Sequence, residues 1–389
     1  MTTTLEQEHS LFFHTYQRLP LEVERGEGCY LYTKDGSKYL DMFSGLAVNA
    51  LGYAHPAVTA AIETQVRKYT HLSNLFLQEQ QIKLAALLVK HSGYEKVFLC
   101  NSGTEANEGA IKLVRRWGSK KGKSTIFGMS NGFSGRTMGA LSLMDKEKYR
   151  EGYGPFLENF GVIEYNNCAD LEARVNTDTA AVFFESIQGE GGIVPMTAEF
   201  AAALVALQKK YGFLLVADEI QSGIGRTGRM FAFEQFGMKP DLVTFAKPVG
   251  GGLPLGGILG SNAIADVWSP GMHGTTFGGN PVACAAGVAV LGIVLEGEFL
   301  QTLRENSAYF FDCLNELKRS CSLIKEVRGS GYMIGVDLTV ESGPVVEKLL
   351  ERRVLVNSTA HTVVRILPPL IAGKPEIDAF IRVFKEVLA

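Results

Sequence analysis

The middle of the chain alternates continuous apolar runs with amphipathic stretches, and this alternation limits the fold more than any other feature of the sequence. Runs rich in Val, Ile, Leu and Phe are typical of strands that are covered on both faces. Such runs are Lys96–Asn101, Ser124–Met129, Ala180–Glu185, Phe213–Glu219, Asp241–Ala246 and Gly256–Gly260. Helix-like stretches between them are Glu105–Gly118, Ala198–Tyr211 and Pro281–Leu295. Because the two patterns alternate, we expect an α/β domain with a largely parallel sheet.

The two ends of the chain have a different pattern, and we expect them to form a smaller α+β domain. Residues 22–42 contain short strand-like segments around the turn-forming sequence Lys34–Ser37, which predicts a hairpin. The C-terminal part predicts a long amphipathic helix over Glu298–Arg319, followed by strands near Ile324–Arg328 and Met333–Leu338. The predicted division is residues 1–55 as the N-terminal segment of the small domain, residues 56–295 as the large domain and residues 296–389 as the C-terminal small domain.

The composition is that of an ordinary globular chain and argues against several classes of function. A net charge of −3 and an isoelectric point near 6.2 give no sign of nucleic-acid binding. No apolar stretch reaches the roughly 18–20 uninterrupted residues of a membrane-spanning helix, and no signal peptide is visible at the start. The cysteines are scattered without a CxxC pair, so we expect reduced thiols and no metal site. These features predict a cytoplasmic protein.

A lysine and an acid end two of the apolar runs. Lys247 follows the run that begins at Asp241 and opens a glycine-rich segment, whereas Asp218 and Glu219 end the run that begins at Phe213. Burial lowers the pKa of a lysine, and the free amine can form a Schiff base with an aldehyde. Enzymes that use pyridoxal phosphate need such a lysine and an Asp or Glu for the pyridine nitrogen. Either residue alone could be an ordinary strand-end charge, but the two together favour a pyridoxal phosphate site.

Two further segments carry groups that suit such a cofactor. Asn101–Glu108 follows a strand and starts a helix, and Ser102 and Thr104 can cap that helix. The first turn of a helix can bind a phosphate, although the same residues also fit a plain capping box. In a later loop, Phe133 precedes Arg136 by three residues. An aromatic side chain can stack on a pyridine ring, and an arginine can hold a carboxylate through two hydrogen bonds.

Three glycine-rich segments remain. Glu185–Gly192 carries two carboxylates directly after an apolar strand, which is the rim position of an α/β site. Gly271–Asn280 offers hydroxyl groups that can bind a phosphate. Gly223–Gly228 matches the GxGxxG pattern of dinucleotide-binding folds. However, the acid that follows it, Asp241, begins a strand instead of ending one, and we therefore do not expect a nicotinamide site.

Together these segments resemble the class III (ornithine/acetylornithine-type) aminotransferases, which use pyridoxal phosphate. The resemblance extends from about Leu19 to the C-terminus, and its motifs are NSGTEAN, FSGRT, ESIQGEGG, ADEIQSGIGRTG, TFAKPVGGG, HGTTFGGNP and RILPPL. It implies the fold type I of pyridoxal phosphate-dependent transferases, with a mostly parallel seven-stranded sheet in the large domain and a smaller α+β domain from both chain ends. It also implies a homodimer whose active sites lie at the subunit interface.

The resemblance implies a role for each site residue. Lys247 holds the cofactor, and Asp218 pairs with its pyridine nitrogen. The other cofactor contacts that the resemblance implies are Gln221 near the cofactor hydroxyl, Phe133 on the ring, Glu185 beside it, and Ser102, Gly103 and Thr104 at the phosphate together with Thr276 of the partner subunit. Arg136 resembles the residue that binds the α-carboxylate of an ornithine-type donor. Glu190 and Arg365 resemble a gate, an ion pair that opens so that the arginine can bind the α-carboxylate of glutamate.

Within the family, the segments beginning at Arg18 and Ser44 are similar to those of acetylornithine aminotransferases. Leu46 stands where ornithine enzymes tend to carry a tyrosine, which makes room for an N-acyl group, whereas Tyr16 matches a substrate-contacting tyrosine of ornithine enzymes. We therefore expect transfer of the distal amino group of N-acetylornithine to 2-oxoglutarate, in arginine biosynthesis. The alternatives are a succinylornithine, ornithine or 4-aminobutyrate aminotransferase, or an aminomutase of the glutamate-semialdehyde type.

Overall fold

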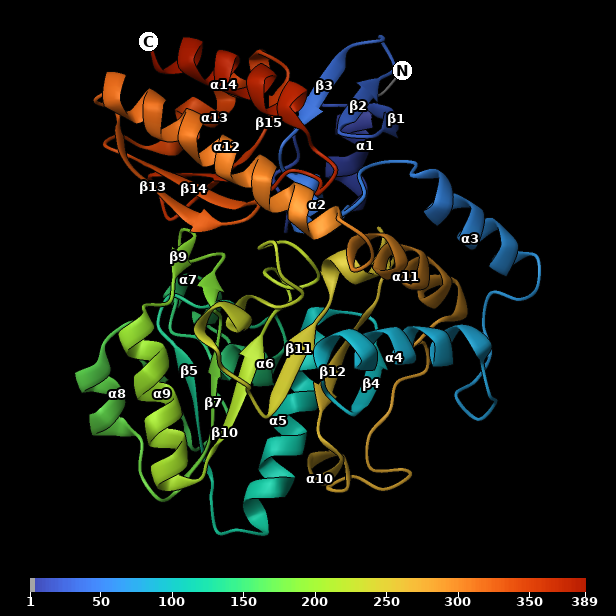
Figure 1. Ribbon diagram of the computed structural model, residues 1–389, viewed down its shortest axis with the longest axis vertical. Coiled ribbons are helices and arrows are strands. Elements are labelled where there is room, and N and C mark those ends of the chain that lie inside the picture. The colour runs from blue at the N-terminus through green and yellow to red at the C-terminus, as the bar shows by residue number, and fades with distance from the viewer. Residues whose placement is uncertain (1–3) are drawn as a thin grey trace.

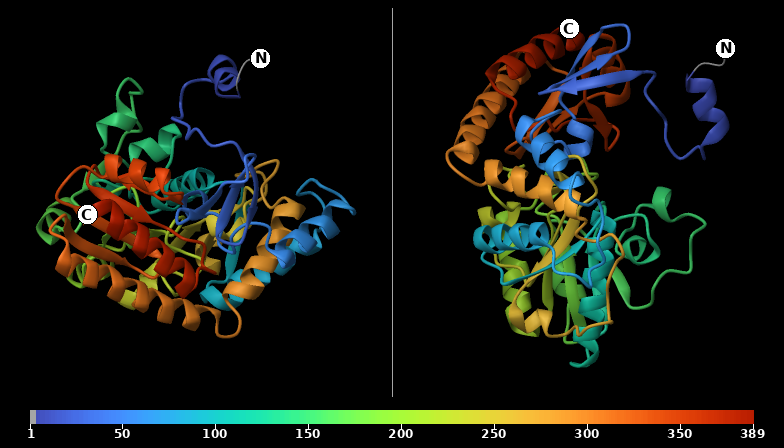
Figure 2. Two further views of the ribbon diagram at one scale, coloured as in Figure 1. Left: turned by 90° about the horizontal axis from the view of Figure 1, so that it is seen from above. Right: turned by 90° about the vertical axis from the view of Figure 1, so that its right-hand side faces the viewer.

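The computed structural model describes residues 4–389, and in it the chain forms two lobes (Figure 1). The lower lobe surrounds one large sheet formed by the middle of the chain. The upper lobe contains the first strands, in blue, and the last helices, in red, and the right panel of Figure 2 shows the same two lobes from the side. Residues 1–3 of the predicted N-terminal segment lie outside the described residues.

The sheet of the lower lobe has the strand order β4-β12-β11-β10-β7-β5-β6. Its strands are β4 (Lys96–Cys100), β5 (Thr125–Met129), β6 (Phe160–Ile163), β7 (Thr179–Phe184), β10 (Leu214–Asp218), β11 (Leu242–Phe245) and β12 (Gly256–Gly260). Only β12 runs antiparallel to its neighbours in this sheet, so the predicted mostly parallel seven-stranded sheet is confirmed. Every residue of β7, β10, β11 and β12 is buried, which explains their continuous apolar runs.

Helices cover both faces of this sheet (Figure 1). Successive residues of β7 pack into two different cores. Val182 belongs to the core that contains Leu204 of α9, and Ala181 belongs to the core that contains Leu113 of α5. Because successive residues of a strand point to opposite faces, α9 and α5 lie on opposite sides. The helices of this lobe are α3 (Pro56–Val66), α4 (Glu79–Ser92), α5 (Gly103–Ser119), α6 (Met138–Ser142), α7 (Glu147–Arg150), α8 (Cys168–Arg174), α9 (Ala198–Tyr211), α10 (Asn262–Ala265) and α11 (Pro281–Val294).

The upper lobe combines both ends of the chain, because a C-terminal strand joins the N-terminal sheet. That sheet has the order β1-β2-β3-β15, and β15 pairs with β3 in parallel. A second sheet has the order β13-β14-β17-β16. The strands are β1 (Val23–Glu27), β2 (Tyr30–Thr33), β3 (Lys38–Asp41), β13 (Ile324–Ser330), β14 (Met333–Leu338), β15 (Val354–Leu355), β16 (Asn357–Thr359) and β17 (Val363–Ile366). The expected hairpin around residues 34–37 and the two expected C-terminal strands are present. The domain boundaries after residues 55 and 295 stay a prediction.

Three helices cover the upper lobe, and its core joins residues from both chain ends. Phe310 and Phe380 share this core with Leu40 and Met42. The remaining helices are α1 (Thr4–Leu11), α2 (Ser44–Ala47), α12 (Phe299–Ser320), α13 (Ser342–Glu351) and α14 (Lys374–Leu388). Helix α1 stands apart from both lobes (Figure 2, right).

Between residues 4 and 389, no single helix is long and apolar enough to cross a membrane. Helices α11 and α12 meet the criterion of length and apolar composition only as a pair, which is bent by 69°.

Candidate active site

A cavity of about 360 Å³ lies at the ends of the parallel strands, where the lower lobe faces the upper one. The carboxyl ends of the strands are the usual position of a ligand site in an open α/β sheet. Of the residues predicted to bind cofactor or substrate, those that line this cavity are Ser102, Gly103, Thr104, Phe133, Glu185, Glu190, Asp218, Gln221 and Lys247. The fold therefore brings together residues that are more than 140 positions apart in the sequence.

Lys247 lies two residues beyond β11 and begins the 3₁₀ turn η2 (Lys247–Gly250). Its φ is +48°, which is uncommon for a residue with a side chain. Burial lowers the pKa of the Lys247 amine, although the nearby carboxylate of Asp218 opposes this shift. A lower pKa increases the fraction of neutral amine, which is the nucleophilic form.

Asp218 is the last residue of β10, the strand adjacent to β11. Its carboxylate accepts hydrogen bonds from Nδ2 of Asn107 at 2.8 Å and from the backbone N–H of Ile220 at 3.1 Å. Burial raises the pKa of Asp218 to about 6, because these neutral donors and the Lys247 charge compensate only part of the desolvation. The site thus holds a buried acid that a further cation would stabilise.

Glu185 and Gln221 line the wall beside Asp218. Glu185 accepts hydrogen bonds from the backbone N–H groups of Phe133 at 3.0 Å and Gly189 at 3.1 Å, so it fixes two loops of the cavity. Burial, and then the nearby Asp218 carboxylate, raise the pKa of Glu185 to about 8. Gln221 is buried, and its Oε1 atom has no hydrogen-bond partner among the described residues. That oxygen is a free acceptor at the cavity.

The N-terminal end of α5 points its first turn at the cavity. Ser102 caps the helix, and its Oγ accepts a hydrogen bond from the backbone N–H of Glu105 at 3.2 Å. The Glu105 carboxylate in turn accepts the backbone N–H of Asn101 at 2.6 Å. A β-carbon on Gly103 would lie 2.7 Å from the side chain of Ile220, so the tight approach of helix and strand end requires glycine. The positive end of the helix dipole makes this turn suitable for an anion.

Phe133 and Arg136 come from the same loop but have different surroundings. Phe133 lines the cavity and packs edge-on against Tyr149, with 5.7 Å between ring centres. Arg136 is exposed and does not line the cavity; its guanidinium lies 4.2 Å from the ring centre of Tyr149 and 5.5 Å from that of Phe133. Tyr149 therefore joins the arginine to the aromatic wall, a contact that the loop sequence did not indicate.

Glu190 and Arg365 form an ion pair between the two lobes, with 2.5 Å between Oε1 and Nη1. Arg365 lies on β17, is 2% exposed, and also donates to Oδ1 of Asn357 from Nη2 at 2.6 Å. Burial is the largest single influence on the pKa of Glu190 and raises it, but the charge and hydrogen bond of Arg365, together with the charges of Lys247 and Lys146, outweigh burial and lower that pKa below its ordinary value. Glu190 lines the cavity and Arg365 does not, so the carboxylate forms the wall and the guanidinium lies behind it.

Four predicted residues do not line the cavity: Arg136 and Arg365, described above, and Tyr16 and Thr276. Tyr16 is 74% exposed and follows helix α1, which stands apart from the lobes. Thr276 is exposed in the segment before α11, and its expected contribution from a partner subunit stays a prediction.

Comparison with known proteins places the chain in a family. The model of the aminotransferase class-III family matches residues 12–388. This chain is a class III aminotransferase. An acetylornithine aminotransferase of Caldanaerobacter subterraneus is 42% identical over 386 residues, covering 98% of each chain. One of Methanocaldococcus jannaschii is also 42% identical, over 98% of this chain and 97% of its own length.

Solved structures of aminotransferases share this fold. An ornithine aminotransferase of Toxoplasma gondii superimposes with a TM-score of 0.94 at 29% identity, covering 100% of this chain and 95% of its own. An N-acetylornithine aminotransferase of Stenotrophomonas maltophilia gives a TM-score of 0.85 at 31% identity, covering 98% of both chains. The predicted fold class and family are thereby confirmed.

Two residues of this aminotransferase belong to the site but were not assigned a role from the sequence. Nδ2 of Asn107 donates hydrogen bonds to Oδ2 of Asp218 and to the backbone oxygen of Ser134, at 2.8 Å each. Its place in the NSGTEAN segment, in the second turn of the helix that Ser102 caps, was the available signal. Lys146 donates from Nζ to the backbone oxygen of Glu190 at 2.7 Å. Nothing in its local sequence distinguishes it from an ordinary surface lysine.

Proposed function

We propose that this enzyme uses pyridoxal phosphate to move the distal amino group of N-acetylornithine to 2-oxoglutarate. The products are N-acetylglutamate 5-semialdehyde and glutamate, and the reaction belongs to arginine biosynthesis. The observation that carries the proposal is the convergence of Lys247 and Asp218, from the ends of adjacent strands, on one cavity. The names of the relatives at about 42% identity support the choice of donor.

The cavity residues fit pyridoxal phosphate. Its volume of about 360 Å³ is within the range of small-molecule sites, roughly 300–1,000 Å³. Asp218 is a buried acid that suits a protonated ring nitrogen, the free Oε1 of Gln221 suits a hydroxyl donor, and the α5 N-terminus suits a phosphate. Lys247 would hold the aldehyde carbon, and Phe133 would flank the ring. When bound, the cofactor supplies an aldehyde for amines and a ring that withdraws electrons from the reacting carbon.

Lys247 is the proposed proton carrier. Because burial lowers its pKa, more of the amine is neutral near pH 7, and it can take a proton from the carbon that bears the amino group and return it. Asp218 keeps a proton on the nitrogen that faces it, because a carboxylate and a cation form a charge-assisted hydrogen bond.

One cavity has to accept two substrates of different shape. In N-acetylornithine the reacting nitrogen is far from the α-carboxylate, whereas in glutamate the two are adjacent. We assign the donor's α-carboxylate to Arg136 and that of glutamate to Arg365. The ion pair with Glu190 covers Arg365 while the donor is bound, and its release exposes the guanidinium for glutamate or 2-oxoglutarate.

The proposal includes a homodimer with shared active sites. Exposed apolar side chains occur in two segments, with Leu75 and Leu77 more than 90% exposed and Phe277 59% exposed. Asn74 donates hydrogen bonds to the backbone oxygens of Thr275 and Gly278, so the two segments lie side by side. Exposed apolar side chains gathered in this way are typical of an interface. Thr276 of the partner subunit would then supply a hydroxyl to the phosphate. Sedimentation velocity should give the mass of a dimer or a multiple of it.

Steady-state kinetics with 2-oxoglutarate test the choice of donor. We expect the highest kcat/KM for N-acetylornithine among N-acetylornithine, N-succinylornithine, ornithine and 4-aminobutyrate. Ornithine is the competitor to compare first, because an ornithine aminotransferase, that of Toxoplasma gondii, is among the similar solved structures. A higher kcat/KM for ornithine would reject the proposed donor, and formation of 5-aminolevulinate from glutamate semialdehyde without any keto acid would reject the reaction class.

A further inference from the structure

Two arginines occupy one row across the C-terminal sheet. Arg328 of β13 lies opposite Gly335 of β14, and Gly335 lies opposite Arg365 of β17. Residues directly opposite each other on neighbouring strands project to the same face. The two arginines therefore share a face, with two strand spacings, about 10 Å, between their backbones.

The loop that carries Glu190 lies over the glycine between these arginines. This loop, residues 189–193, joins the short strands β8 (Ile187–Gln188) and β9 (Val194–Pro195). A β-carbon on Gly335 would lie 2.8 Å from Cβ of Ile193 and 3.3 Å from the backbone oxygen of Gly192. Ile193 is fully buried there. Glycine thus allows the loop to rest directly on the sheet.

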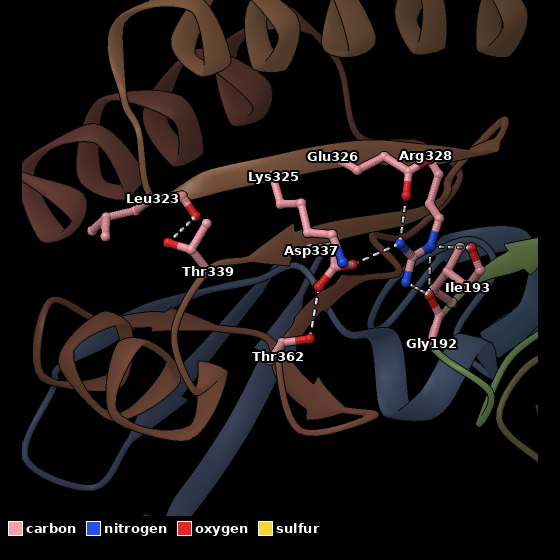
Figure 3. Close-up of polar contacts among 9 residues, drawn as sticks. All are labelled: Gly192, Ile193, Leu323, Lys325, Glu326, Arg328, Asp337, Thr339 and Thr362. Carbon is pink, nitrogen blue, oxygen red and sulfur yellow. Dashed lines mark hydrogen bonds and ion pairs between the residues drawn. The ribbon is translucent and has the colours of Figure 1, made fainter.

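Arg328 binds the backbone of this loop (Figure 3). Its Nε donates to the carbonyl oxygens of Gly192 at 3.0 Å and Ile193 at 3.2 Å, and its Nη2 donates to Gly192 at 2.8 Å. The remaining Nη1 lies 3.0 Å from Oδ2 of Asp337 and 2.7 Å from Oε2 of Glu326. The guanidinium is therefore oriented by carboxylates on one side and binds the loop on the other.

The loop needs such support because its backbone is strained. Ile193 has a φ of +53°, which is a true outlier for a β-branched residue. Residues in this region persist only where the surrounding structure holds them. At the other end of the loop, the backbone oxygen of Glu190 accepts hydrogen bonds from Lys146 at 2.7 Å and from Thr359 at 3.2 Å.

We propose that Arg328 is a positioning residue that fixes Glu190 opposite Arg365 and thereby sets the preference between the two substrates. Arg328 does not line the cavity, so it acts through the loop. A looser loop would weaken the Glu190–Arg365 pair and leave Arg365 more available to a carboxylate next to the reacting nitrogen. This inference rests on the proposed role of the ion pair.

The test is Arg328→Gln in the holoenzyme, with single-turnover absorbance measurements of each half-reaction. The ratio of the glutamate rate constant to the N-acetylornithine rate constant should rise about three- to tenfold. In a Glu190→Ala background, Arg328→Gln should change this ratio no further, because the Glu190 carboxylate that Arg328 positions is already absent. Glu326→Gln is the matched control: it removes one negative charge beside Arg328 but leaves Asp337 to orient the guanidinium and keeps every contact with the loop, so the ratio should stay unchanged.

Amide hydrogen exchange gives a second measurement that does not depend on activity. A peptide covering residues 187–195 should exchange faster in Arg328→Gln than in wild type. Three results would each overturn this inference and leave the proposed function intact. Both half-reactions could slow equally, the ratio change could add fully to that of Glu190→Ala, or the exchange of residues 187–195 could stay unchanged. If wild type transaminates neither glutamate nor N-acetylornithine, the proposed function fails and the inference fails with it.

Discussion

At the scale of single residues, burial determines the chemistry of the cavity. It lowers the pKa of Lys247 and raises that of Asp218, so each group is closer to its neutral form than it would be in water. A lysine that is partly neutral can act as a nucleophile and a base. An acid with a raised pKa gains the most from a cation placed beside it. Both shifts follow from positions at the ends of strands whose residues are all buried.

Lys247→Ala should remove transamination while the protein stays folded. The lysine carries the proton in the proposed reaction, and loss of general base catalysis alone costs typically about 10²–10⁴-fold in rate. The measurement is kcat with N-acetylornithine and 2-oxoglutarate, with thermal melting as the check on folding. Lys239→Ala, which changes an exposed lysine, is the control and should keep the wild-type kcat. A near-normal rate for Lys247→Ala would contradict the assignment.

Asp218→Asn should keep the shape of the site but lower kcat on the order of 100-fold or more. A neutral amide does not stabilise a cation on the nitrogen that it faces. The amide also puts a donor opposite the Asn107 Nδ2 group, unless its oxygen takes that position. Binding of pyridoxal phosphate, followed by absorbance, should persist. An unchanged kcat would move the role to another acid.

Arg136→Ala should raise the KM for N-acetylornithine far more than the KM for glutamate. The proposed role of Arg136 is to bind the α-carboxylate of N-acetylornithine, and loss of a charged contact of this kind costs about 2–5 kcal/mol. The expected result is a large rise in KM for N-acetylornithine and little change for glutamate, which serves as the internal control. Equal damage to both substrates would show that the arginine only supports Tyr149 and Phe133.

Local sequence patterns predicted the residues at strand ends but not their partners. Lys247 and Asp218 follow apolar runs, and that signal is local. Asn107 reaches Asp218 across 111 residues of sequence, and Tyr149 reaches Arg136 from a separate short helix. Such contacts depend on how elements pack, which a pattern within one segment does not contain.

At the scale of elements, the register of the C-terminal sheet is the feature that the sequence least determined. The strands at residues 324–328 and 333–338 were predicted, but the row that aligns Arg328, Gly335 and Arg365 depends on pairing with β17. Strand β6 in the large sheet was not among the runs named from the pattern, because its four residues include Gly161 and give little periodicity. The resemblance to the family supplied the seventh strand.

Gly335→Ala should displace the loop that carries Glu190. The new methyl group would lie 2.8 Å from Cβ of Ile193, a contact that has to relax by movement of the loop. Overpacking of this kind costs typically about 1–3 kcal/mol of stability, and the half-reaction ratio should shift toward glutamate. Gly343→Ala in helix α13 is the matched control, since nothing lies within 4 Å of its added methyl group. Equal effects of the two substitutions would contradict the packing argument.

At the scale of the whole molecule, one buried arginine links the two lobes and both ends of the chain. Arg226, from the segment after β10, is fully buried. It donates to the backbone oxygens of Tyr332, at 3.2 Å, and Pro368, and to Oγ of Ser44 at 3.4 Å. The Glu190–Arg365 pair crosses between the same lobes. The geometry of this ion pair therefore depends on how firmly the lobes are held together.

Arg226→Met should lower the stability of the lobe contact. Methionine fills much of the same volume, but it leaves two carbonyl oxygens buried without donors, at about 1–3 kcal/mol each. Replacing a buried charge with an apolar side chain also removes the cost of burying that charge, which can offset the loss. The hydrogen-bond partners of Arg226 are neutral and stay in place, and the nearby buried carboxylate of Asp41 would lose a compensating charge. We therefore expect the losses to dominate and Tm to fall by a few degrees. Arg304→Met is the control: this exposed residue also donates to a backbone oxygen, that of Gly228, and its loss should change stability by no more than about 0.5 kcal/mol. A Tm for Arg226→Met equal to that of wild type would mean that apolar packing alone holds the lobes.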